Sequence, residues 1–231
     1  MHAYDTGGFG EQADSSPGIR DWSFETAADE LEKHLGNIGR GGAMIVGASM
    51  GGTAALVLAS RAPEGLAGVI AIGASPRALS SPDWAFGVDA GTRDAIVGLL
   101  QADLISGAEQ LFPQALFNDD DKEAARRGLD LALASVRRLR DPRRPVEVLR
   151  RAYEEDLRPL LPSVSVPVLL IHGEKDQVAP PAVGEWMAAR MPQARFAVVA
   201  GAGHAPHVTY PEQVAALISD FNATVESQSG A

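Results

Sequence analysis

The chain has 231 residues, of which 45% are hydrophobic and 22% are charged, a balance typical of one globular domain with or without an insertion. It contains no cysteine, which excludes disulfides, thiolate metal sites and a cysteine nucleophile. The net charge of −10 argues against general nucleic-acid binding, because such binding needs a basic face.

The N-terminal residues have neither a basic segment nor an apolar run of the signal-peptide type. No stretch of about 18 apolar residues occurs either, so no membrane-spanning segment is expected. We therefore expect a cytoplasmic protein that does not associate with a membrane.

The first third of the chain alternates strand and helix patterns. Residues 2–4 are predicted to end a strand that leads into a glycine-rich loop at 5–10. Apolar residues at helical spacing predict a helix over 24–35 that ends at Gly36. The order of the elements that follow is a strand over 43–46, a helix over 49–62 stopped by Pro63, and a strand over 66–72.

Residues 77–160 show no strand pattern and consist of helical segments separated by turn residues. Strand and helix patterns then alternate again: a strand over 166–171, a helix over 181–191, a strand over 195–200, a helix from 211 to about 224 and a frayed tail over 226–231. Continuous apolar strands between helices predict an α/β fold with a mostly parallel sheet that helices cover on both faces. We expect residues 1–76 and 161–231 to form this core and residues 77–160 to form a helical lid over one end of the sheet.

Ser49 lies in the stretch IVGASMGG (45–52), between a predicted strand and a predicted helix. A nucleophilic serine on a sharp strand-to-helix turn needs glycines two positions away on either side, here Gly47 and Gly51, because side chains there would collide. The helix start also supplies an N–H group, that of Met50, for a developing oxyanion. The alternative is an ordinary turn in which Ser49 caps the helix.

Asp176 and His204 each follow a predicted strand, at the sheet edge where the sites of α/β proteins gather. A carboxylate at 176 can orient an imidazole, and the glycine-rich loop around His204 can bring that imidazole over Ser49. The alternatives are a turn-forming Asp176, Glu174 as the acid, and His207 as the base. The order Ser, Asp, His along the chain is that of α/β-hydrolases.

The chain resembles a serine esterase of the α/β-hydrolase family. The resemblance rests on YDTGGFG (4–10), GASMGG (47–52), HGEKDQVAP (172–180) and GAGHAPHVTYPEQ (201–213). Within that family, the stretches 70–88 and 203–211 are most similar to pimeloyl-[acyl-carrier protein] methyl ester esterases of biotin synthesis. The resemblance implies the α/β-hydrolase fold, ester hydrolysis and an acidic acyl carrier protein as partner.

Members of this family carry further strands and a His-Gly loop before the segment matched here by residues 4–10. That loop supplies the second oxyanion N–H, and His172-Gly173 cannot replace it because it belongs to the strand that carries Asp176. We therefore expect a chain shortened at its N-terminus relative to the family, either because Met1 is internal to a longer reading frame or because the chain is a fragment. The Met50 N–H is the one oxyanion donor we can assign, and the second is expected to be missing.

The predicted mechanism has Ser49 attack an ester carbonyl, His204 accept its proton and Asp176 orient the imidazole, through an acyl-enzyme. It needs no metal and no organic cofactor. In the lid, Trp84 and Phe86 are candidates for lining the acyl pocket of a small-molecule ester, with core packing as the alternative.

Arginines cluster in the second half of the lid. They are either a landing patch for an acyl carrier protein or a solvated helix face that balances neighbouring acids; the members are Arg137, Arg138, Arg140, Arg143, Arg144, Arg150 and Arg151. Two other functions stay open for the whole chain. One is a non-catalytic binding protein of the same fold, and the other is a cofactor-free haloperoxidase or lactonase.

Overall fold

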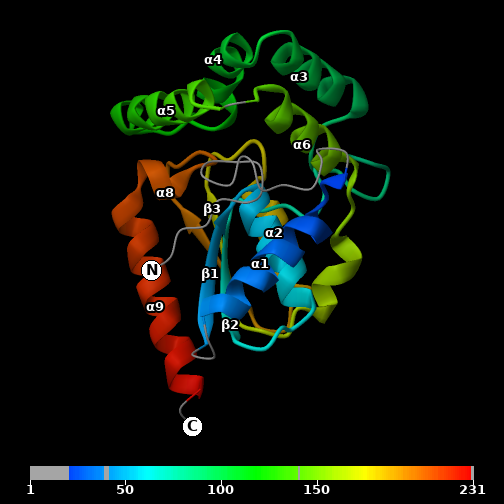
Figure 1. The fold of residues 1–231 in the computed structure, drawn as a ribbon. Helices are drawn as coiled ribbons and strands as arrows, with labels where there is room; N and C mark the ends of the chain where they lie inside the picture. The colour runs from blue at the N-terminus through cyan, green and yellow to red at the C-terminus, as the bar shows by residue number, and fades with distance from the viewer. Residues whose placement is uncertain (1–20, 39–41, 140, 230–231) are drawn as a thin grey trace.

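The computed structural model describes residues 21–38, 42–139 and 141–229 (Figure 1). The strand predicted at 2–4 and the loop predicted at 5–10 lie outside the described residues, as does Arg140. Within the described ranges, no helix has the length and apolar character needed to cross a bilayer.

A parallel sheet of four strands, in the order β1-β2-β3-β4, forms the centre of the described chain. Its strands are β1 (Ala43–Ala48), β2 (Leu66–Ile72), β3 (Val168–Gly173) and β4 (Ala194–Val199). Since all four strands run in the same direction, their carboxyl ends lie at one edge of the sheet, where the loops that carry Ser49, Asp176 and His204 begin.

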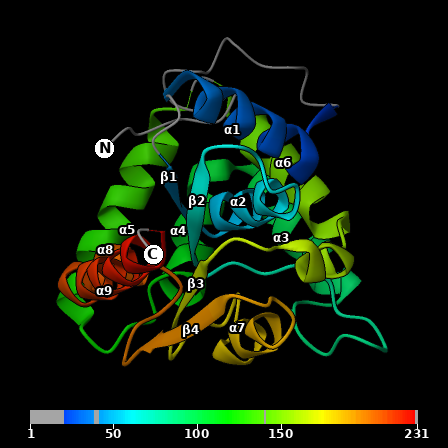
Figure 2. The same ribbon diagram turned by 90° about the horizontal axis from the view of Figure 1, so that it is seen from below.

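Alternate residues of β2 and β3 build two separate cores on the two faces of the sheet. Ile70 and Ile171 face α9 (Pro211–Ser229), whereas Val69 and Leu170 face α2 (Met50–Ser60) and α7 (Pro181–Ala188). Seen from below, the sheet lies between α9 on one side and α2 with α7 on the other (Figure 2). Both central strands are therefore buried on both faces, which explains their continuous apolar sequences.

The remaining helices cover α2 or the carboxyl edge of the sheet. Helix α1 packs against α2 through Phe24 and Ala28. Four helices between β2 and β3 lie above the carboxyl edge (Figure 1). These four helices are α3 (Ala90–Ala102), α4 (Leu104–Ala115), α5 (Lys122–Arg137) and α6 (Arg143–Glu154). The other helices are α1 (Phe24–Ile38), the 3-10 helix Arg158–Ser163 and α8 (Pro206–Thr209).

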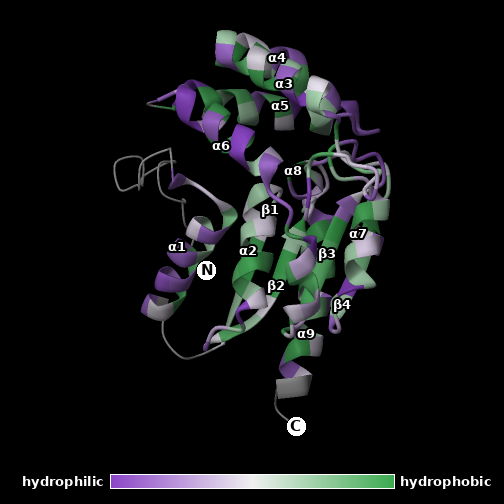
Figure 3. Ribbon diagram, turned by 90° about the vertical axis from the view of Figure 1, so that its right-hand side faces the viewer, coloured by the Kyte–Doolittle hydropathy of each residue, from purple (hydrophilic) through white to green (hydrophobic). Residues whose placement is uncertain are grey.

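Hydropathy follows this layering. The strands and α2 are mainly hydrophobic, while α1 and α6 carry long hydrophilic stretches (Figure 3). At the edge of the described sheet, β1 leaves Val46 54% exposed, since its side chain points to the α9 side and α9 covers mainly β2 to β4.

Several predicted boundaries differ from the structure by a few residues, and three of the differences have a local cause. Helix α1 continues through Gly36 to Ile38, because a glycine with free space around it tolerates helical backbone. Strand β3 starts at Val168, after Pro167, which has no N–H to donate to a neighbouring strand. The tail does not fray at 226: α9 runs to Ser229, because Phe221 and Val225 pack against the sheet.

Candidate active site

Ser49 occupies a strained turn between β1 and α2. Its φ of 50° and ψ of −121° lie in a region that costs a residue with a side chain roughly 1–3 kcal/mol. The Ser49 N–H donates to the Ile72 carbonyl at 2.7 Å, which ties the turn to β2. The hydroxyl makes no hydrogen bond to the helix start and instead lies 3.0 Å from His204 Nε2. The helix-cap alternative for this side chain is thus excluded.

A glycine is needed at Gly47, as the motif predicts, but the second glycine that is needed is Gly52 and not Gly51. A Cβ at Gly47 would lie 2.5 Å from the backbone of Gly51, and a Cβ at Gly52 would lie 2.8 Å from the Gly47 carbonyl oxygen. A Cβ at Gly51 would meet nothing within 4 Å. The close approach of strand and helix therefore requires Gly47 and Gly52, and the expectation that a side chain at Gly51 would collide was wrong.

Asp176 uses its two carboxylate oxygens for two tasks. Oδ1 accepts hydrogen bonds from the N–H groups of Val178 and Ala179, both at 2.9 Å, which fixes the loop after β3. Oδ2 lies 2.8 Å from His204 Nδ1. Asp176 therefore forms the turn after β3 and also contacts the imidazole of His204, while its role in catalysis stays a prediction. The exposed Glu174 accepts from the Gly201 N–H instead of contacting the imidazole.

His204 follows β4 and is buried between Ser49 and Asp176, with 5% of its surface exposed. A carboxylate only accepts hydrogen bonds, so Nδ1 carries the proton and Nε2 is free to accept one from the Ser49 hydroxyl. Gly73, at the end of β2, makes room for the ring: a Cβ there would lie 3.0 Å from His204 Cε1. His207 lies on α8 with an exposed side chain, so the geometry selects His204 over it.

A second, buried histidine supports the acid loop. His172 Nδ1 donates to the Ala179 carbonyl at 2.8 Å, and the Ala179 N–H in turn donates to Asp176 Oδ1. Burial lowers the pKa of His172, because the charged imidazolium loses its hydration. The sequence showed His172 at the end of a buried strand and four residues before Asp176, but not that its ring turns back to this loop.

Comparisons with known proteins place the chain in a family. Residues 2–217 match the alpha/beta hydrolase family. The chain belongs to the alpha/beta hydrolase family. This hydrolase is 30% identical over 221 residues to the pimeloyl-[acyl-carrier protein] methyl ester esterase of Neisseria meningitidis serogroup B (strain H44/76), across 96% of the chain and 81% of that relative.

Two further comparisons extend the family assignment. The esterase of the same description from Aromatoleum aromaticum is 33% identical over 183 residues, which cover 77% of this chain and 73% of the relative. A hydrolase structure from Oleispira antarctica superposes with a TM-score of 0.83 at 22% identity, covering 93% of this chain and 78% of that one. This chain is thus an enzyme of the esterase type, and the predicted family and fold are confirmed.

The start of α2 places a free backbone N–H group next to Ser49. Met50 is the first residue of α2, directly after Ser49, so its N–H belongs to the donors that a helix start leaves free. The Thr53 N–H, by contrast, donates to the Ser49 carbonyl. No second donor was assigned from the sequence, so Met50 remains the donor we predict.

Trp84 and Phe86 belong to the apolar core rather than to a cavity wall. Trp84 is 2% exposed and makes edge contacts with the rings of Phe86 and Trp186. Its indole N–H donates to the Arg77 carbonyl at 3.1 Å, and the Arg158 guanidinium lies over its ring. These contacts favour the packing alternative for Trp84, whereas Phe86 is only half-buried against the same core.

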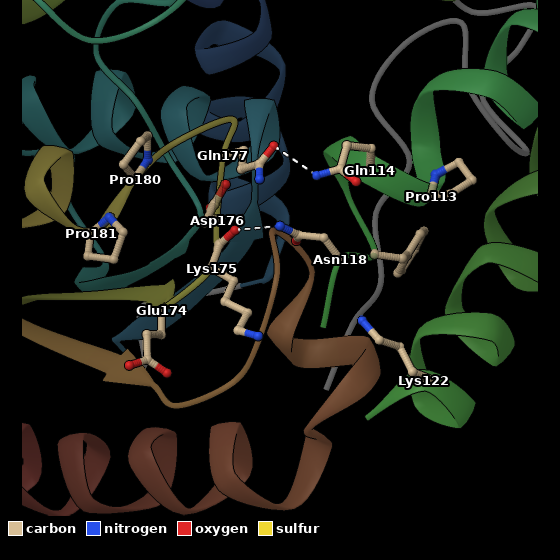
Figure 4. Close-up of a pocket in the computed structure, with 11 residues that line it drawn as sticks. Pro113, Gln114, Asn118, Lys122, Glu174, Lys175, Asp176, Gln177, Pro180 and Pro181 are labelled. Atoms are coloured by element: carbon tan, nitrogen blue, oxygen red, sulfur yellow. Dashed lines mark hydrogen bonds between the residues drawn. The ribbon is translucent and has the colours of Figure 1, made fainter. Parts of the chain in front are cut away.

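A cavity of about 720 Å³ opens instead between α4 and the loop after β3 (Figure 4). Gln114 and Asn118 line it from the helical layer, by which we mean the segment between β2 and β3 that lies above the carboxyl edge of the sheet. Lys175, Asp176 and Gln177 line it from the loop after β3. The cavity therefore lies beside Asp176, at one end of the hydrogen-bonded residues Ser49, His204 and Asp176.

Most arginines of the predicted patch are paired with acids of the same chain. Arg137 bonds Glu109 at 2.7 Å, and Arg143 bonds Asp141 at 3.0 Å. The patch residues of α6 behave in the same way, as Arg150 pairs with Glu147 and Glu154 and Arg151 pairs with Glu147. Arg138 ends α5 with an exposed side chain, and Arg144 is half-buried. Pairing of this kind fits the solvated-face interpretation.

Proposed function

We propose that the chain hydrolyses carboxylic esters through Ser49, His204 and Asp176. The observation that carries this proposal is the continuous hydrogen-bonded series Ser49 Oγ, His204 Nε2, His204 Nδ1 and Asp176 Oδ2, with distances of 3.0 and 2.8 Å. In an alternative binding protein, nothing would require a strained, partly exposed serine beside a buried, carboxylate-held imidazole.

The reaction proceeds in two halves. Ser49 Oγ attacks the ester carbonyl while its proton passes to His204 Nε2, and the imidazolium then protonates the departing alkoxide, which leaves as an alcohol. Water attacks the acyl-enzyme, gives one proton to His204, and releases the acid and the Ser49 hydroxyl. Asp176 stays ionised and stabilises the imidazolium. The Met50 N–H donates to the oxyanion in both halves.

For the substrate, we propose an acyl methyl ester carried by an acyl carrier protein. The curated relatives are described as acting on such an ester. The helices α3 to α6 would form the lid over the reacting group, and the exposed arginines on α5 and α6 would receive the acidic carrier. The guanidinium of Arg143 is 87% exposed, so its pairing with Asp141 is weak and can be exchanged for a partner's carboxylate. A cytoplasmic location stays a prediction.

A fluorophosphonate probe tests the catalytic proposal. It should label the wild-type protein at Ser49, and Ser49→Ala should lose both labelling and hydrolysis of p-nitrophenyl esters. Ser60→Ala is the matched control, because Ser60 lies at the other end of α2, where its hydroxyl donates to the Val57 carbonyl. Undiminished turnover by a folded Ser49→Ala variant would contradict the proposal and favour a non-catalytic binding protein or a different site.

A panel of substrates and a salt series test the finer proposal. An acyl carrier protein carrying a methyl ester should be hydrolysed with a KM that rises steeply with salt and rises further in Arg143→Glu. Arg195→Glu, on the distant strand β4, should leave that KM unchanged. Preference for lactones, or halogenation activity, would instead assign the same serine to the alternative enzymes.

A further inference from the structure

The segment between α4 and α5 contacts the loops of both the acid and the histidine. This segment, residues 116–121, ends in four consecutive polar residues: Asn118, Asp119, Asp120 and Asp121. The reaction above uses none of them, yet Asp119 is fully buried, with 0% of its surface exposed. A buried carboxylate is costly unless hydrogen bonds compensate it, so its partners indicate what it holds in place.

In the described part of the chain, both donors to the Asp119 carboxylate lie on the polypeptide that flanks His204. Its Oδ1 accepts from the Gly203 N–H at 2.8 Å and from the Thr209 hydroxyl at 2.7 Å. Gly203 directly precedes His204, and Thr209 closes the short helix α8 that follows. Hydrogen bonds to a carboxylate are about twice as strong as neutral ones, so they fasten this loop on both sides of the imidazole.

The neighbours of Asp119 extend this fastening. The Asn118 side-chain amide donates to the Lys175 carbonyl at 2.8 Å, one residue before Asp176 (Figure 4). The Asp120 N–H donates to the Gly201 carbonyl at 2.8 Å, and the Asp120 carboxylate pairs with the Lys175 ammonium. One segment of the helical layer therefore holds the residues directly before both Asp176 and His204.

The approach is close enough to require glycine in the histidine loop. A Cβ at Gly203 would lie 2.5 Å from Asn118 Oδ1 and 3.2 Å from Asp119 Oδ2. Gly201 has a φ of 70°, a conformation that suits glycine. Two glycines so close to His204 also make the free loop flexible, so an external constraint is needed to keep its imidazole in one place.

We propose that Asp119 is a positioning residue, which fixes His204 over Ser49 from the helical layer, with Asn118 doing the same for the loop of Asp176. This inference rests on the proposed function, because it assigns Asp119 to the hydrolysis for which Ser49 is the nucleophile. Misplacing a catalytic group by about 1 Å costs on the order of 10²-fold in rate. Loss of the Asp119 carboxylate should therefore lower kcat far more than it affects substrate binding.

The experiment compares Asp119→Ala with Asp119→Asn in the full chain, using p-nitrophenyl butyrate. We expect kcat to fall by about 10- to 100-fold in Asp119→Ala with a KM within twofold of the wild type. Asp119→Asn keeps an acceptor oxygen in the place of Oδ1 and should recover most of kcat. The low-field NMR signal of the His204 Nδ1 proton should broaden or vanish in the alanine variant and persist in the asparagine variant.

Asp121→Ala is the matched control. Asp121 is exposed and caps α5 by accepting from the N–H groups of Glu123 and Ala124, so its loss should weaken the start of α5 without releasing the histidine loop. Its kcat should equal that of the wild type. Wild-type kcat in a folded Asp119→Ala variant, or equal losses of kcat in Asp119→Ala and Asp121→Ala, would overturn the proposal.

Two further variants cover a failure of Asp119→Ala to fold. Thr209→Val removes the hydroxyl that donates to the Asp119 carboxylate, and Asn118→Ala removes the amide that donates to the Lys175 carbonyl. Each variant should lower kcat several-fold at unchanged KM. Wild-type kcat in both variants would overturn the proposal. Ser49→Ala separates the two levels of inference. If it is inactive and all these variants are fully active, only the role of Asp119 fails; if it is active, the proposed function fails.

Discussion

Replacing Gly47 with alanine would place a methyl group inside the start of α2. The new Cβ would lie 2.5 Å from the carbonyl carbon and oxygen of Gly51 and 2.6 Å from the Gly52 nitrogen. Cβ atoms in proteins essentially never come closer than 3.0 Å to such atoms, so these contacts are too short by about half an ångström. All three atoms are backbone, so the strand end and the helix start must move apart. Overpacking of this kind costs about 3 kcal/mol.

Gly51→Ala is the informative comparison, since it alters the same motif. Its Cβ would meet nothing within 4 Å, and alanine favours helical backbone over glycine by up to about 1 kcal/mol. Urea unfolding followed by circular dichroism should therefore show Gly47→Ala destabilised by about 3 kcal/mol and Gly51→Ala unchanged or more stable.

Gly47→Ala should also lose activity. A shift of half an ångström would lengthen the 3.0 Å contact between Ser49 and His204 to the limit of a hydrogen bond. We expect kcat to fall on the order of 10²-fold in Gly47→Ala. Equal destabilisation by the two alanines, or a Gly47→Ala variant as stable as the wild type, would refute the steric reasoning.

Two further predictions concern titrating groups. Hydrogen bonds from Arg158 and Arg77 lower the pKa of Asp156 to about 2, so its contribution to stability is present above about pH 4 and is lost as the pH falls towards 2. Asp156→Asn should cost roughly 1–2 kcal/mol in urea unfolding at pH 7 and less at pH 3; an equal cost at both would contradict the ion pair. Burial lowers the pKa of His172, so wild-type stability should decline as the pH falls below 6.5; His172→Gln, which keeps a donor for the Ala179 carbonyl, should flatten that decline.

The fold followed from the sequence wherever local patterns decide it. Strand β2 spans the predicted residues 66–72, because an apolar run bounded by Gly65 and Gly73 has few other solutions. Ser49, Asp176 and His204 come together as predicted because each lies in the connection that follows a parallel strand, and such strands end at one edge.

What the sequence did not reveal depends on contacts between distant residues. The run NDDD at 118–121 has the pattern of a helix start, and Asp121 does cap α5. Nothing local indicates that Asp119 turns inward to Gly203, 84 residues away. Likewise, Trp84 lies in the core because Trp186, a residue of the distant helix α7, packs against it.

The segment at 118–121 has a consequence for anyone who would exchange substrate-covering helices between esterases. If residues 77–160 of this chain were replaced by the corresponding helices of another esterase, Asn118 and Asp119 would be removed with them. The chimaera would then lack the two residues that we propose to position Asp176 and His204. Donor helices that lack an equivalent carboxylate should yield folded but slow chimaeras, whatever substrates they admit. The segment that would set the substrate specificity of this chain thus also carries residues on which its turnover should depend.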